Sequence, residues 1–141
     1  PVLVVLKGAH ADVLPESSEL LSEEERVSWS ETAGLWPEDV RAAIGPSIGA
    51  CCFETDGDVP EAVRAWLGAA DAEPYIRPKN NSGKFLVDLR GALRCRLLQL
   101  GLAPEHIAVS DECTMCLHEK YWSHRYTRGG VRGSQCAVIC L

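Results

Sequence analysis

The clearest metal-ligand spacing in this sequence lies near the C-terminus. Cys113 and Cys116 form a C-x2-C pair, and His118 and His124 follow within eight residues of Cys116. Thiolates and imidazoles are the ligands that tetrahedral zinc takes in proteins. Zinc sites usually combine two such pairs, and the sequence shows one here. A zinc-binding module and a set of buried thiols beside surface histidines therefore both remain open.

A second cysteine pair, Cys51 and Cys52, follows a glycine-rich turn. A nucleophilic cysteine needs a base or a helix N-terminus to stabilise its thiolate, and the sequence shows no partner base. We expect a short strand over residues 51–54. Because neighbouring residues of a strand point to opposite faces, at most one of the two thiols should then face a cleft. The pattern suits structural cysteines as well as a nucleophile.

A turn and an arginine could each donate hydrogen bonds to a bound oxyanion. Gly45, Ser47 and Gly49 lie in the turn GPSIG, whose backbone N–H groups can bind an anion, although a sharp exit from a strand needs the same residues. Arg125 carries a planar guanidinium that binds phosphate or carboxylate through two parallel hydrogen bonds. Three more basic residues lie near it in the sequence: Lys120, Arg128 and Arg132.

Composition narrows the function classes. The 141 residues fit one domain, and a formal charge of −6 disfavours a nucleic-acid partner. No apolar run approaches the roughly 18–20 residues of a membrane span, so no membrane partner is expected. Seven cysteines are an odd number and do not suit a disulfide scaffold. We therefore expect a reduced, cytoplasmic protein.

The hydrophobic pattern predicts alternating strands and helices. Strands are expected over residues 2–6, 40–44, 51–54, 85–87, 107–109, 121–126 and 136–141. Helices are expected over residues 23–33, from Asp58 onwards, and over 89–100, where Leu89, Leu93, Leu97 and Leu100 form one apolar stripe that ends before Gly101. A polar turn is expected at 78–83. The predicted class is α/β with mixed strand pairing towards the C-terminus.

Several of these segments together resemble one family. The segments are AIGPSIGACCFE at 43–54, VDLR at 87–90, Cys113-Thr114, YWSHR at 121–125 and RGSQCAVI at 132–139. They are similar to the laccase-domain, multicopper polyphenol oxidase-like proteins, which are regarded as purine nucleoside phosphorylases. Some bacterial members are called peptidoglycan editing factors. The resemblance covers residues 38–141 and about the C-terminal half of a full-length member.

The resemblance implies a three-layer α/β single domain, of which residues 1–141 form the C-terminal portion and which is incomplete at its N-terminus. It implies phosphorolysis of adenosine, inosine, guanosine and methylthioadenosine, with adenosine deamination as a second reaction. The implied partners are a purine nucleoside and phosphate, and Arg125 with the turn at 45–49 are our candidates to bind them. The implied cofactor is zinc, held by two histidines and one cysteine, and copper is also associated with the family. The resemblance assigns no catalytic residue to this chain.

Only one family metal ligand falls inside this sequence, and that ligand is His10. In the family the corresponding histidine opens the motif HAGWRG, whereas here His10-Ala11 is followed by Asp12. Residues 11–33 form an atypical segment, as a frameshift or a splice variant would produce. Because a catalytic zinc needs about three protein ligands, we expect this chain by itself to be inactive.

Three alternatives to this interpretation remain. One is a peptidoglycan-editing hydrolase of cell-wall precursors, which would use the same site. Another is a non-catalytic zinc-binding module built from Cys113, Cys116, His118 and His124. A copper laccase is disfavoured because it needs several histidine clusters and the chain has four histidines in total.

Overall fold

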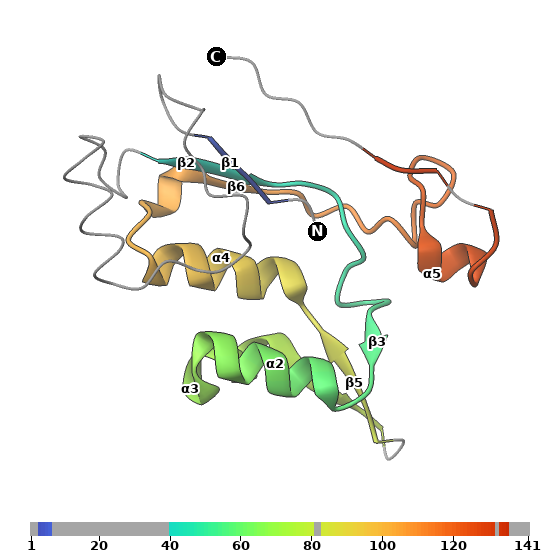
Figure 1. Ribbon diagram of the computed structural model, residues 1–141, viewed down its shortest axis with the longest axis horizontal. Helices are drawn as coiled ribbons and strands as arrows, with labels where there is room; N and C mark the ends of the chain where they lie inside the picture. The colour runs from blue at the N-terminus through green and yellow to red at the C-terminus, as the bar shows by residue number, and fades with distance from the viewer. Residues whose placement is uncertain (1–2, 7–39, 81–82, 132, 136–141) are drawn as a thin grey trace.

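The protein is described by a computed structural model that covers residues 3–6, 40–80, 83–131 and 133–135 (Figure 1). Four sequence-based expectations lie outside these residues. They are the metal ligand His10, the atypical segment 11–33, the helix at 23–33 and the strand at 136–141.

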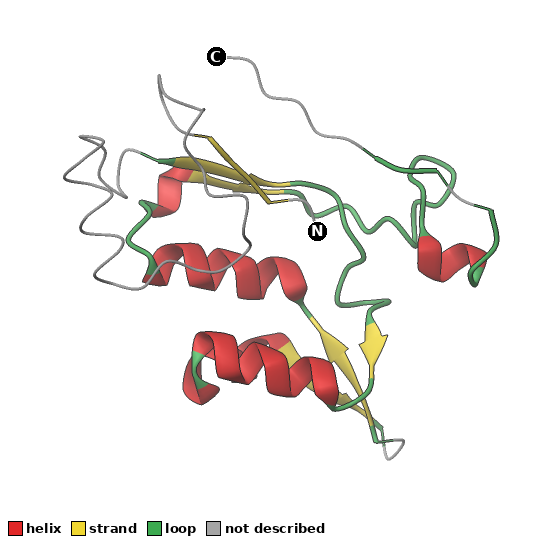
Figure 2. Cartoon of the chain, viewed as in Figure 1, coloured by secondary structure: helices red, strands yellow, loops and turns green. Residues whose placement is uncertain are grey.

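In the described residues, two three-stranded sheets form the framework (Figure 2). The first sheet has the order β1-β2-β6, with β1 at Leu3–Leu6, β2 at Arg41–Ile44 and β6 at Ile107–Val109. Strand β1 runs antiparallel to β2, and β6 runs parallel to it. The predicted mixed pairing is confirmed, although in this sheet the antiparallel neighbour is the N-terminal strand β1 and not a strand towards the C-terminus. The strands expected at 2–6, 40–44 and 107–109 are also confirmed.

The second sheet is antiparallel throughout. Its order is β3-β5-β4, with β3 at Glu54–Thr55, β5 at Lys84–Val87 and β4 at Ile76–Lys79. The polar residues expected to form a turn connect β4 to β5, although Pro78 and Lys79 themselves pair in β4. The predicted strand at 85–87 is confirmed as part of β5.

The helices lie between and beside the sheets. They are α2 at Asp58–Leu67, α3 at Ala69–Ala72, α4 at Leu89–Gln99 and α5 at His124–Thr127, and single 3-10 turns occur at Glu73–Tyr75 (η3) and Pro104–His106 (η4). Helix α2 begins at Asp58 as predicted, with Asp58 and Glu61 at its positive end. Gly68 ends it with φ +89°, a conformation that L side chains rarely adopt.

Helix α4 joins two hydrophobic cores and lies between the first sheet and α2 (Figure 1). Towards the first sheet, Leu97 packs in a core made with Ala42, Ile44, Leu102 and Ile107. Towards α2, the fully buried Ala92 packs in a core made with Val63, Leu67, Ala72, Ile76 and Val87. The prediction of a single leucine stripe was therefore incomplete, because the helix buries two faces and the small residue Ala92 marks the second.

Asp88 caps the N-terminus of α4 by accepting a hydrogen bond from the Gly91 amide at 3.1 Å. We expect Asp88→Ala to lower the free energy of unfolding by about 0.5–2 kcal/mol, because it leaves that amide without its side-chain partner. Asp88→Asn keeps an acceptor and should cost less. Urea denaturation followed by circular dichroism measures both, and equal losses in the two variants would contradict the capping role.

Two expected strands are wrong in whole or in part. Residues 121–126 contain the start of α5 instead of a strand, because the Ser123 side chain accepts a hydrogen bond from the Tyr126 amide and caps the helix. In the segment 51–54, only Glu54 belongs to a strand. Cys52 and Phe53 both donate their amides to the Gly49 carbonyl at 2.9 Å, which closes a turn.

Within the described ranges no helix has the length and apolar composition to cross a bilayer.

Candidate functional site

The candidate site lies where the chain leaves the parallel strands β2 and β6. Parallel strands end at the same edge of a sheet, so the two following segments start side by side. The Ser110 amide donates to the Ile44 carbonyl at 2.8 Å, and the Thr114 amide donates to the Ser47 carbonyl at 3.0 Å. Ser47 and Cys113 also pair as an isolated parallel bridge. Two segments 64 residues apart in the chain are thereby held together at this edge.

Four cysteine thiols meet at this edge. The Sγ atom of Cys116 lies 3.4 Å from that of Cys52 and 3.7 Å from that of Cys51. Together with Cys113, all four Sγ atoms lie within 4.8 Å of one another. We call this group the cysteine cluster. The expectation that Cys51 and Cys52 point to opposite faces is wrong, because they lie in a turn and both reach Cys116.

The electrostatic environment differs among the four thiols. Burial acts to raise the pKa of Cys113, but the amides of Gly49, Cys116 and Met115 donate to its sulfur and lower the pKa to about 6. The Gly49 amide lies 3.2 Å from this sulfur. For Cys51 and Cys52, burial and the neighbouring thiols raise the pKa instead. Cys113 is thus more readily ionised than Cys51 or Cys52, although it is buried, whereas Cys51 is exposed.

The turn expected to bind an anion lies directly beside the cluster. Gly49 uses its amide on Cys113, and a Cβ atom at this position would lie 2.9 Å from the Arg90 guanidinium and 3.3 Å from the Cys51 sulfur. Gly45 has open space around it. Ser47 is buried, and its hydroxyl has no hydrogen-bond partner within the described residues. An anion-binding role for this turn stays a prediction.

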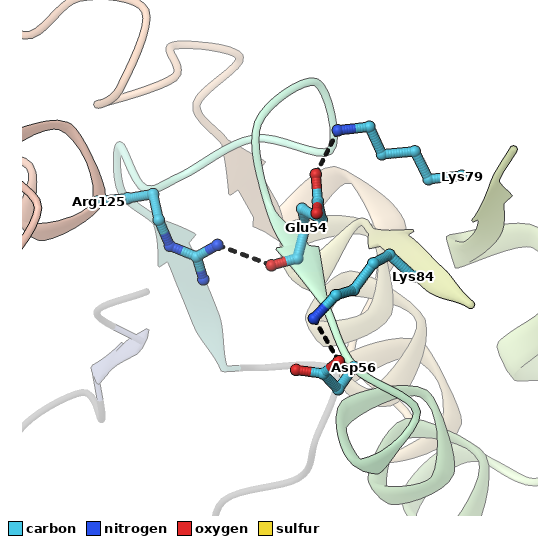
Figure 3. Close-up of polar contacts among 5 residues, drawn as sticks. All are labelled: Glu54, Asp56, Lys79, Lys84 and Arg125. Atoms are coloured by element: carbon cyan, nitrogen blue, oxygen red, sulfur yellow. Dashed lines mark hydrogen bonds and ion pairs between the residues drawn. The ribbon is translucent and has the colours of Figure 1, made fainter. Parts of the chain in front are cut away.

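Arg125 approaches the same region from α5. Its Nη1 donates to the main-chain carbonyl of Glu54 at 2.7 Å (Figure 3). The Arg125 guanidinium also lies over the Phe53 ring. Figure 3 also shows Lys79 paired with the Glu54 carboxylate and Lys84 paired with Asp56. The hydrogen bond from Lys79 lowers the pKa of Glu54. Arg125 and the turn at 45–49 therefore flank the same short segment, residues 50–54.

The two histidines proposed as zinc ligands lie in other environments. The His118 ring stacks on Tyr126 with centroids 3.6 Å apart, and His124 begins α5. In the part of the chain that the structure describes, the group of clustered metal-ligand atoms contains cysteines alone. The two cysteine pairs come together because each follows a strand of the same parallel pair, β2 and β6.

A family model described as "Multi-copper polyphenol oxidoreductase laccase" matches residues 21–141. The chain belongs to this family. The match confirms the resemblance found in the motifs and extends further towards the N-terminus than residues 38–141. The mixed α/β architecture of this laccase-type chain also agrees with the expected fold class.

Similar proteins include one named as a purine nucleoside phosphorylase and one named as an adenosine deaminase. Over 111 residues the chain is 36% identical to "Purine nucleoside phosphorylase YlmD" of Geobacillus stearothermophilus, covering 79% of this chain and 39% of the relative. Over 92 residues it is 32% identical to "Adenosine deaminase RL5" of an unknown prokaryotic organism, covering 65% of this chain and 34% of the relative.

The crystal structure of YlmD from Geobacillus stearothermophilus matches the fold with a TM-score of 0.65 and 34% identity. The match covers 75% of this chain and 38% of that structure. The chain thus spans less than half the length of these relatives.

Proposed function

We propose that this chain is part of a purine nucleoside phosphorylase that cleaves adenosine, inosine, guanosine and methylthioadenosine with phosphate and also deaminates adenosine. The similarity to the Geobacillus phosphorylase, which extends over 79% of the chain, carries the proposal. The relative named as an adenosine deaminase supports the second reaction.

Arg125 and the turn at 45–49 are the groups that we propose to bind phosphate. A guanidinium has five N–H donors, and the bond to the Glu54 carbonyl uses one of them while fixing the position of the side chain. Ser47 adds a buried hydroxyl that has no protein partner in the described residues. Because buried polar groups are normally hydrogen-bonded, this hydroxyl is available to a bound phosphate oxygen. These groups would position the phosphate and stabilise its charge.

His10 is the residue that we propose as the zinc ligand of the phosphorylase site. A zinc ion there would supply Lewis-acid polarisation of substrate or an activated water. Since such a site needs about three protein ligands and the family pattern gives this chain one, we propose that the 141-residue chain is inactive by itself. A phosphorolysis assay of the chain with adenosine, phosphate and zinc should release no adenine, and zinc-dependent release would contradict this statement.

The catalytic proposal is tested with a chimera in which residues 40–141 replace the equivalent part of the Geobacillus phosphorylase. We expect phosphate-dependent release of adenine. Arg125→Met in the chimera should lower kcat/KM by roughly 100-fold or more, since it removes a charged hydrogen-bond donor from the phosphate. Arg64→Met, which removes the surface pair with Glu73, is the matched control and should leave kcat/KM unchanged. A folded chimera without turnover would contradict the proposal.

A further inference from the structure

The spacing of the sulfurs in the cysteine cluster matches a tetrahedral metal site. With zinc–sulfur bonds of about 2.3 Å, the sulfurs of a regular tetrahedron lie about 3.8 Å apart. The measured separations of 3.4 Å and 3.7 Å from Cys116 are close to this value, and no pair exceeds 4.8 Å. Shifts of less than about 1 Å would therefore bring all four sulfurs to bonding distance of one ion.

The backbone holds the four thiols in place from two sides. Cys51 and Cys52 are presented by the turn closed on the Gly49 carbonyl. Cys113 and Cys116 are presented by a turn in which the Leu117 amide donates to the Cys113 carbonyl at 2.9 Å. The C-x2-C spacing of the second pair is the one that zinc knuckles use. A four-cysteine zinc site needs two more ligands beside Cys113 and Cys116. The turn after β2 supplies them as Cys51 and Cys52.

Further groups around the cluster suit bound thiolates. The Gly49 amide donates to the Cys113 sulfur, as amides that orient metal-bound thiolates do. A zinc ion with four thiolates carries a net charge of about −2. The Arg90 guanidinium lies beside Gly49 and offsets part of that charge. Cys51 and Cys116 are exposed, so an ion can enter from solvent.

We propose that Cys51, Cys52, Cys113 and Cys116 form a structural zinc site that clamps the turn after β2 to the turn after β6. The cysteine site shares no ligand with the phosphorylase zinc, whose proposed ligand is His10. On binding, each protonated thiol releases its proton to solvent, and no redox step is involved. The chemistry of the donors favours zinc, because four thiolates select soft or borderline ions over magnesium or calcium. The clamp would hold the turn at 45–49 beside Cys113, with which Ser47 pairs.

Metal titration of the full chain tests the site. The reduced protein is stripped with chelator and titrated with Co²⁺, and then with Zn²⁺ in the presence of a colorimetric competitor. We expect one ion per chain, sulfur-to-cobalt charge-transfer absorption and displacement of cobalt by zinc. We also expect zinc removal to lower the melting temperature. No metal uptake by the reduced chain, or formation of a Cys52–Cys116 disulfide in its place, would overturn the proposal.

Cys116→Ser is the informative variant because Cys116 is exposed and its replacement should leave the fold intact, as circular dichroism can check. We expect zinc affinity to fall by more than the roughly 10–100-fold that loss of a supporting partner costs. Cys95→Ser, on α4 and outside the cluster, should bind zinc like the wild type. His10→Ala and the double variant Cys136→Ser/Cys140→Ser should also bind like the wild type. Equal affinity of Cys116→Ser and the wild type, or loss of binding in His10→Ala, would contradict the assignment.

Discussion

Replacing Ile44 with alanine is expected to lower the free energy of unfolding by about 2–5 kcal/mol. Ile44 is 2% exposed at the end of β2, the central strand of the first sheet. It packs in the core that contains Leu97 of α4 and Ile107 of β6. Truncation leaves a cavity among partners from α4 and β6, which cannot both move inward at once. Since domains are stable by only about 5–15 kcal/mol, a loss of this size removes a large part of the total.

Val109→Ala is the matched control for Ile44→Ala. Val109 pairs directly with Ile44 in the sheet but is 40% exposed. The same type of truncation there should cost less than about 1 kcal/mol, because less apolar surface leaves a buried environment. Urea denaturation of both variants, followed by circular dichroism, gives the two free energies. Similar losses would show that the first sheet does not depend on burial at Ile44.

Local sequence patterns predicted the elements whose signals are local. Strands β1, β2, β5 and β6 have short apolar runs, and α2 begins with acidic residues and Pro60, so each could be assigned from its own residues. The strand predicted at 121–126 was wrong because the aromatic residues of this segment favour a strand, whereas Ser123 caps a short helix. The second face of α4 was missed because Ala92 is small, and an apolar stripe is recognised mainly from its large residues.

The candidate site depends on contacts between distant parts of the chain, and the sequence predicted less of it. Cys51 and Cys116 are 65 residues apart, and their proximity follows from the parallel pairing of β2 and β6. No local spacing encodes that pairing. The spacing of the C-x2-C pair leaves metal binding and buried thiols both open, and the nearest further ligands in the sequence are His118 and His124. The Gly49 amide, which donates to Cys113, belongs to a turn that was proposed to bind an anion.

Replacing Arg90 with methionine is expected to lower the free energy of unfolding by about 1.5–3 kcal/mol, as for loss of hydrogen bonds to a charged group. Arg90 lies in the first turn of α4, and its Nη1 donates to the carbonyls of Ser110 at 2.6 Å and Glu112 at 2.9 Å. Glu112 directly precedes Cys113, and Ser110 lies three residues before it. The arginine thereby fixes the segment after β6 against the helix. Its loss should also weaken zinc binding by roughly 10–100-fold, the usual effect of removing a group that supports a metal site.

Arg64→Met separates this role from a general effect of lost charge. Arg64 pairs with Glu73 at 2.8 Å, and the Glu73 side chain is 60% exposed, so its loss should cost less than about 1 kcal/mol. Zinc affinity should stay at the wild-type value in this control. If Arg90→Met has the same free energy of unfolding and the same zinc affinity as the wild type, the guanidinium does not position Cys113. If stability falls while zinc affinity is kept, Arg90 stabilises the fold, and the geometry of the cluster depends on the two turns alone.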